Sequence, residues 1–95
     1  MTGQASISAD IIGRYAADVA REVDGVRGLA GRRPVKVTGE DGSVRVELHL
    51  TLEWGVSIPA VGRAVQARVQ EYLGRMADVE PAMVEVVVHD IGTPA

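Results

Sequence analysis

The strongest pattern in the sequence is a strict alternation of apolar and polar positions. It places Val44, Val46, Leu48, Leu50, Leu52 and Trp54 on one side and Arg45, Glu47, His49, Thr51 and Glu53 on the other. Successive side chains of a strand point to opposite faces, so this period of two predicts a long strand with one buried and one wet face. A slip of one residue would expose six apolar side chains, at about 1.5–3 kcal/mol each, which fixes the register. We expect Trp54 to end this buried set as a core anchor.

Two other segments carry the 3.6-residue repeat of an amphipathic helix. The first covers residues 9–23 and begins after Ser8, whose side chain can accept from the free amides of the first turn. The second begins after Ser57, has Pro59 in its first turn and runs to about residue 76. Tyr15 and Tyr72 fall on the apolar faces of these helices, so both are expected in the core.

Two further strands are predicted, one before the long strand and one after the second helix. Residues 34–38 alternate, and the turn residues at 39–42 predict a hairpin into the long strand. Residues 83–91 are apolar and β-branched, which is typical of a strand. Between the first helix and residue 34, three spaced glycines predict a loop that turns the chain back.

The predicted order is α-β-β-α-β, an α/β chain of the α+β two-layer class. Both helices would cover one face of a three-stranded mixed sheet, and the crossover would make the last strand parallel to the long one. We expect one domain over residues 1–95 with an ordered core of about 7–91. The other sheet face stays open and is the predicted interaction surface. Along the long strand it carries Arg45, Glu47, His49, Thr51 and Glu53, with Lys36, Glu85 and His89 on the neighbouring strands.

Composition narrows the classes of function. The 95 residues contain no Cys, which excludes disulfides, thiol nucleophiles and thiolate zinc sites. Ten Lys and Arg against thirteen Asp and Glu give a net charge of −3, so no global basic field attracts nucleic acid. The sequence shows neither a signal peptide nor an apolar run long enough to span a membrane, and we expect a cytoplasmic protein.

The sequence contains few candidate catalytic residues. The serines Ser6, Ser8, Ser43 and Ser57 lie in tails, turns and caps, and none has a base beside it in the sequence. The acidic pairs at 40–41 and at 78 and 80 lie in predicted turns, where carboxylates are common. We therefore expect no enzyme activity, no catalytic residue and no cofactor.

The two histidines fall on the wet faces of their strands, near acidic residues. If the strands were adjacent, His49 and His89 could converge with Glu47 and Glu85 on an ion such as zinc. Alternating His and Glu are ordinary on a solvated strand, and no short His-x-x-His spacing supports a site. We therefore predict no metal site and keep a small-ligand or metal sensor as a third hypothesis.

The alternative function is a KH-like RNA-binding module, because the predicted order is close to the second type of KH domain. That module grips single strands with a Gly-x-x-Gly loop between two helices. Here the match at 25–28 precedes the first predicted strand. The basic residues Arg27, Arg32, Arg33 and Lys36 are available for phosphate contacts. Three aromatic residues in all give no stacking platform, and we do not expect a nucleic-acid partner.

Several segments recur in the order and spacing of a known family. They are Ile7-Ser8 opening a helix, the loop at 23–31, the strand at 44–55, the turn Trp54-Gly55-Val56-Ser57-Ile58-Pro59 and the closing strand at 84–89. Together they resemble the alkaline shock, or Asp/Gls-type general stress, protein family of bacteria across essentially the whole domain. Two positions depart from the family pattern: Ala60 stands where a glutamate would complete a capping box, and Asp24 replaces a proline.

The resemblance implies a non-enzymatic, cytoplasmic stress-response protein linked to cell-envelope homeostasis. In some members a small membrane-anchored partner holds the protein near the membrane, and members self-assemble. We therefore expect a protein partner or self-association, and no direct membrane insertion. An open sheet offers one uncovered face and its edges for such contacts. The leading hypothesis is a scaffold or interaction module, and the family supplies no catalytic residue to carry over.

Overall fold

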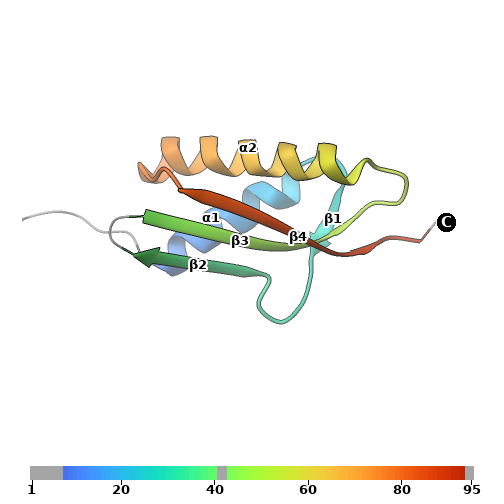
Figure 1. The fold of residues 1–95 in the computed structure, drawn as a ribbon, viewed down its shortest axis with the longest axis horizontal. Helices are drawn as coiled ribbons and strands as arrows, with labels where there is room; N and C mark the ends of the chain where they lie inside the picture. The colour runs from blue at the N-terminus through green and yellow to red at the C-terminus, as the bar shows by residue number, and fades with distance from the viewer. Residues whose placement is uncertain (1–7, 41–42, 94–95) are drawn as a thin grey trace, which may run out of the picture.

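The computed structural model describes residues 8–40 and 43–93 of the chain (Figure 1). Its elements are α1 (Ala9–Glu22), β1 (Val26–Leu29), β2 (Val35–Glu40), β3 (Ser43–Leu52), α2 (Ile58–Ala77) and β4 (Met83–Ile91). The α+β class with two helices against one sheet is confirmed. The sheet has four strands, one more than expected. The expected helix opening at Ile7 and the turn at 41–42 lie outside the described residues.

The long strand β3 is the centre of the sheet. It pairs antiparallel with β2, from Val35 opposite Leu48 to Glu40 opposite Ser43. It pairs parallel with β4 from Arg45 onward, which confirms the crossover predicted from the sequence. The far end of β3 pairs antiparallel with β1.

The strand β1 lies in the segment that was predicted to be a glycine loop. Gly25, at φ +97°, turns the chain out of α1, and Val26 then stands opposite Leu52. The strand is only four residues long and contains Gly28, so it gives no usable period-two signal. The three-stranded expectation was therefore wrong by this one short strand.

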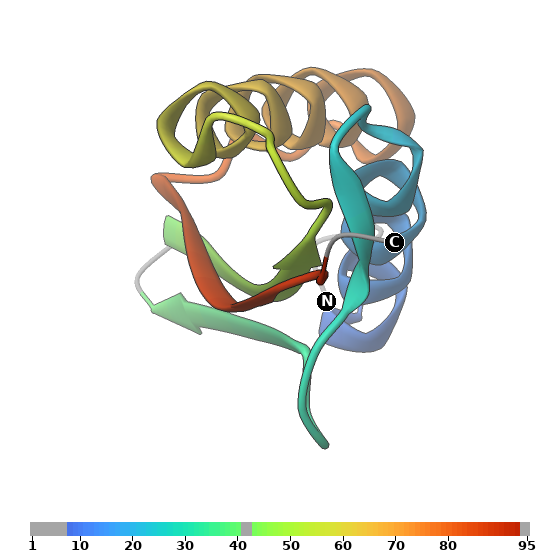
Figure 2. The ribbon, with the colours of Figure 1, turned by 90° about the vertical axis from the view of Figure 1, so that its right-hand side faces the viewer.

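The strands β1 and β2 follow one another along the same edge of β3. The His49 amide donates to the Pro34 carbonyl (2.7 Å), and the His49 carbonyl accepts from the Ala30 amide (2.9 Å). The residues between them, Gly31–Arg33, form a loop that protrudes from the sheet (Figures 1 and 2). This loop therefore lies beside the midpoint of β3.

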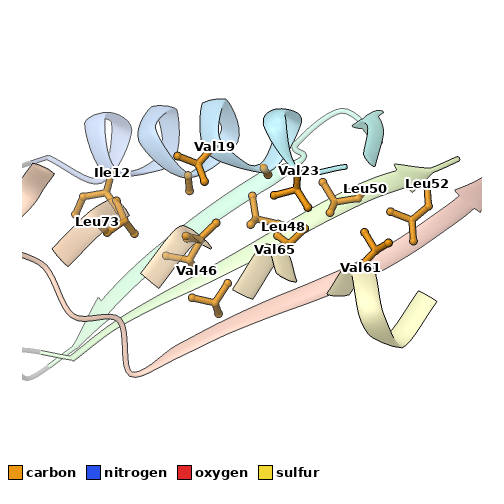
Figure 3. Close-up of a cluster of buried hydrophobic side chains, with 14 residues drawn as sticks. Ile12, Val19, Val23, Val46, Leu48, Leu50, Leu52, Val61, Val65 and Leu73 are labelled. Carbon is orange, nitrogen blue, oxygen red and sulfur yellow. The ribbon is translucent and has the colours of Figure 1, made fainter. Parts of the chain in front are cut away.

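Both helices cover one face of the sheet, and the core lies between them and β3 (Figures 2 and 3). Leu48, Leu50 and Leu52 are fully buried, so the predicted register of the long strand is confirmed. The residues that pack against them from the helices are Ile12, Ala16, Val19, Ala20, Val61, Val65, Val69 and Leu73. Tyr15 and Tyr72 join the two helices edge to face, with ring centroids 5.6 Å apart, and pack against this core as expected.

The helix starts follow the predicted capping residues. Ser8 Oγ accepts from the Ile11 amide (3.3 Å), and Ser57 Oγ accepts from the Ala60 amide (3.2 Å). Each contact satisfies one of the amides that the first turn of a helix leaves free. Neither helix in the described part of the chain is both long and apolar enough to cross a membrane.

Trp54 corrects one prediction. The strand ends at Leu52, and Trp54 lies with Gly55 in the turn before α2, where its side chain is 62% exposed. Gly55 has φ +86°, which redirects the chain at this point. The alternation of residue types thus continues in the sequence past the end of the strand, and Trp54 is no core anchor.

Candidate functional site

The face of the sheet opposite the helices carries the predicted interaction surface. Arg45, Glu47, His49 and Thr51 alternate along β3 with fully buried residues, so they lie on this outer face. Arg45 is exposed, and the other three are half-buried by their neighbours. Glu53 is exposed just beyond the end of β3, where its amide donates to the Gly25 carbonyl. Four of the five predicted residues therefore share one strand surface.

Charges of both signs lie side by side on this outer face. Glu47 has Lys36 opposite it on β2 and Glu85 opposite it on β4. A shallow depression of about 160 Å³ runs across the three strands, lined by Lys36, Thr38, Arg45, Val46, Glu47, Met83 and Glu85. Among the described side chains, neither Lys36 nor Arg45 has a carboxylate within 4.0 Å. These cations are free to meet charges on another molecule.

A larger cleft of about 590 Å³ lies beside the start of α1. Its lining residues are Ala9, Asp10, Gly13, Arg14, Arg33, Val35, Lys36, Val37 and Glu47. The lining combines apolar side chains with both carboxylates and cations. The described residues that line the cleft include no Ser, Thr, Tyr or His, so it contains neither a hydroxyl nor an imidazole side chain.

His49 and His89 lie in contact on the outer face, although 40 positions separate them in the sequence. His49 Nδ1 is 2.5 Å from His89 Nε2, and the rings meet edge to face with centroids 4.7 Å apart. The other nitrogen of His49, Nε2, is 2.6 Å from Glu47 Oε2. The structure thus joins Glu47, His49 and His89 into one polar chain, which we call the histidine pair and its carboxylate.

A β-bulge in β4 lies at this contact. Leu50 stands opposite Val88, but Thr51 stands opposite Asp90, so His89 is an extra residue on β4. Bulges re-aim side chains, and His89 contacts His49 on β3 at the position of this one. The sequence signal for the bulge is the consecutive polar pair His89-Asp90, which breaks the alternation of β4.

The four residues considered for a metal site are only partly brought together. Glu85 lies on the same face, but within the described residues it makes no hydrogen bond or ion pair to either imidazole. Residues 8–40 and 43–93 contain no group of three or more His, Asp or Glu side chains arranged to hold a metal ion. The histidine pair therefore supplies two potential ligands.

The residues that favoured RNA binding are distributed differently from a KH domain. Gly28 lies in β1 with its Cα opposite Thr51, so the glycines at 25 and 28 do not form a free loop between helices. The extra strand also changes the element order to α-β-β-β-α-β. Arg27, Arg32, Arg33 and Lys36 are exposed, and RNA binding stays a prediction with no added support.

The alkaline shock protein 23 family, which is described by a cell envelope-related function, matches residues 31–93 of this chain. The chain belongs to this family. The matched segment starts in the protruding loop and includes β2, β3, α2 and β4, and thus the whole outer face. The family resemblance expected from the sequence is confirmed.

Individual proteins give the same picture of family and fold. The uncharacterized protein YqhY of Bacillus subtilis (strain 168) is 27% identical over 105 residues, which cover 95% of this chain and 76% of YqhY. Two variants of MamM-CTD superpose with TM-scores of 0.66 and 0.65, at 16% and 17% identity. They cover 87% and 85% of this chain and 98% and 90% of their own. At such low identity these two structures share the fold alone with this member of the alkaline shock protein 23 family.

Proposed function

We propose that this chain is a non-enzymatic, cytoplasmic interaction module of its cell envelope-related family, a scaffold that binds through the outer face of β2, β3 and β4. The observation that carries the proposal is the contrast between the two faces of the sheet. Two helices bury the inner face completely at Leu48, Leu50 and Leu52, whereas the outer face has half-buried polar residues and cations that no described carboxylate pairs. A flat, mixed-charge surface of this kind fits a protein partner.

The arrangement of charge favours a second copy of the chain as that partner. Arg45 and Glu47 are neighbours on the same face of β3, and Glu85 lies opposite Glu47 on β4. In a two-fold interface residue i of one copy contacts residue j of the other and j contacts i, so an axis that passes between Arg45 and the carboxylates pairs opposite charges twice. Like charges at Glu47 and Glu85, opposed within one sheet, are also relieved when a cation from the second copy approaches.

Light scattering coupled to size-exclusion chromatography tests self-association. The wild-type chain, over roughly a hundredfold range of concentration, is expected to shift from monomer toward dimer. Arg45→Glu reverses a charge on the outer face, and Thr51→Arg introduces a large cationic side chain there. Both variants are expected to remain monomeric. The matched control is Arg68→Glu, a charge reversal at an exposed position of α2, which should dimerise as the wild type does.

Two results would contradict this assignment. A wild type that stays monomeric at every concentration excludes a second copy as the occupant. Equal loss of dimer in Arg45→Glu and Arg68→Glu shows that net charge, and not the outer face, governs association. Thermal unfolding of each variant establishes that the monomer being measured is folded.

A small membrane-anchored protein, implied by the family resemblance, is the alternative occupant of the same face. Its test is the distribution of a fluorescent fusion in cells. Membrane recruitment that is lost in Arg45→Glu and kept in Arg68→Glu supports such a partner. Recruitment that is unchanged in Arg45→Glu places the binding site elsewhere on the molecule.

A further inference from the structure

The histidine pair directs two ring nitrogens at one point on the outer face. His49 Nδ1 and His89 Nε2 are 2.5 Å apart, so only one hydrogen can lie between them. One of the two nitrogens must therefore present a lone pair to the other. When the ring that holds this hydrogen adopts its other tautomer, with the hydrogen on its far nitrogen, both facing nitrogens present lone pairs and can bind a metal ion between them.

The carboxylate of Glu47 completes an arrangement that metal-binding histidines require. Glu47 Oε2 accepts from His49 Nε2 at 2.6 Å, which places the hydrogen of a neutral ring on Nε2. The lone pair is then on Nδ1, the nitrogen that faces His89. Histidines that bind metals almost always donate their second N–H to such a carboxylate or carbonyl, which fixes the tautomer and raises the basicity of the ligand.

The backbone around the pair supports the same geometry. His49 is held on β3 by two backbone hydrogen bonds, to Pro34 and Ala30, so its position is fixed by the centre of the sheet. His89 is the extra residue of the bulge in β4, and its side chain is exposed. One ligand is therefore rigid and the other can adjust, and both are reached from solvent.

We propose that His49 and His89 are the two protein ligands of a site for a divalent transition-metal ion of the Zn²⁺ class, with Glu47 as the carboxylate that orients His49. This proposal does not rest on the interaction function proposed above. Zinc–nitrogen bonds of about 2.0–2.1 Å in tetrahedral geometry place two nitrogens about 3.3 Å apart. The two ring nitrogens must therefore separate by roughly 0.8 Å from their direct contact. His89, whose side chain is exposed, is the ring that we expect to move.

The remaining coordination positions go to water or to a second copy of the chain. The described residues supply no third ligand at this point. The protruding loop passes beside the site, where a Cβ on Gly31 would lie 3.6 Å from His89 Cε1, and this loop carries the exposed Arg32 and Arg33. Two ligands and nearby positive charge predict an affinity well below that of a closed four-ligand structural site.

Calorimetric titration of the chain with ZnCl₂, in a form without a histidine tag, tests the site. The chain has only two histidines, so no other imidazole contributes heat. Wild type is expected to bind saturably, and His49→Ala and His89→Ala should each abolish that binding. Glu47→Gln keeps both ligands and loses the oriented carboxylate, which should weaken binding about tenfold.

The matched control is Glu85→Gln, which removes the same charge from the same face. Glu85 stands opposite Glu47 and does not contact the histidines, so its variant should bind zinc as the wild type does. The Arg45→Glu variant should also bind zinc, so the site and the proposed dimer can fail separately. Thermal unfolding shows whether each variant is folded before titration.

The proposal is overturned by absence of saturable Zn²⁺ binding to the folded wild-type chain. It is also overturned if both histidine variants bind zinc unchanged, or if Glu85→Gln loses as much affinity as Glu47→Gln. One zinc per chain indicates water in the open positions. One zinc per two chains indicates that a second copy contributes its own pair, and both ratios support the site.

Discussion

Gly25 lies directly against Val61, so close that a Cβ on Gly25 would stand 2.7 Å from Val61 Cγ2. Gly25 also has φ +97°, a conformation that L-residues other than glycine rarely adopt. Gly25→Ala should therefore destabilise the domain through both strain and overpacking, by roughly 2–4 kcal/mol. Urea denaturation measures the loss. The control is Gly28→Ala in β1, where an added Cβ meets nothing within 4 Å and a much smaller change is expected.

The core prediction concerns Leu50, which is fully buried in the middle of β3. Leu50→Ala removes buried apolar surface and leaves a cavity between the sheet and the helices, so it should cost about 2–5 kcal/mol. Val87→Ala, on the half-buried outer face of β4, is the comparison and should cost clearly less. Equal losses at the two positions, measured by chemical denaturation, would contradict the assignment of inner and outer faces.

A stabilising substitution is available at the start of α2. Ser57 caps the helix, Ala60 occupies the third helical position, and the first turn contains no acidic residue. Ala60→Glu would supply the reciprocal hydrogen bond of a capping box and a negative charge near the positive end of the helix dipole. We expect a gain of about 0.5–1 kcal/mol, seen as a melting temperature roughly 2–8 °C higher.

Gln70→Glu serves as the comparison for this gain, because Gln70 is exposed on α2, lies beyond the first turn and has no charged residue three or four positions away. It should change the melting temperature little. A similar rise in both variants would show that added charge, and not capping, is responsible.

Trp54 gives a direct optical test of the turn between β3 and α2. It is the only tryptophan in the chain, and its side chain is 62% exposed. Acrylamide should quench its fluorescence in the folded protein nearly as well as in the denatured protein. Trp54→Ala should cost far less than the roughly 3–5 kcal/mol typical of a buried tryptophan. Strong protection from quenching in the isolated monomer would show that Trp54 is buried in the core, as the sequence pattern predicts.

The sequence was sufficient for the parts of the fold that rest on periodicity. The apolar set from Val46 to Leu52 lies where the alternation predicted, because burial of one face leaves only one register open to the strand. The capping serines, Ser8 and Ser57, likewise act through local geometry that a few residues determine. These features are decided within one element or its immediate neighbours.

The features that were missed depend on contacts between distant segments. The strand β1 is formed by pairing with the far end of β3, and its own four residues have too little pattern to show it. Trp54 continues the alternation of residue types, but the strand ends at Leu52 and the chain turns at Gly55. The alternation therefore no longer indicates which side of a sheet Trp54 faces. A residue pattern does not say where a strand stops when a turn follows at once.

The candidate site shows the same division. The placement of Arg45, Glu47, His49 and Thr51 on one face follows from the period of the strand. The contact between His49 and His89 depends on the pairing of β3 with β4 and on the position of a bulge, neither of which periodicity specifies. The use of that face as a binding surface stays a prediction.

Each of the other three strands in the described sheet is paired with β3. This arrangement affects the order in which the chain folds during synthesis. The hairpin of β2 and β3 closes over a few residues and can assemble early, whereas the parallel partner must wait until α2 has been made and residues 83–91 have left the ribosome. Until then one side of β3 has no strand beside it. The nascent chain therefore exposes an unpaired, aggregation-prone edge until residues 83–91 emerge, which makes the addition of β4 the step at which molecular chaperones would act.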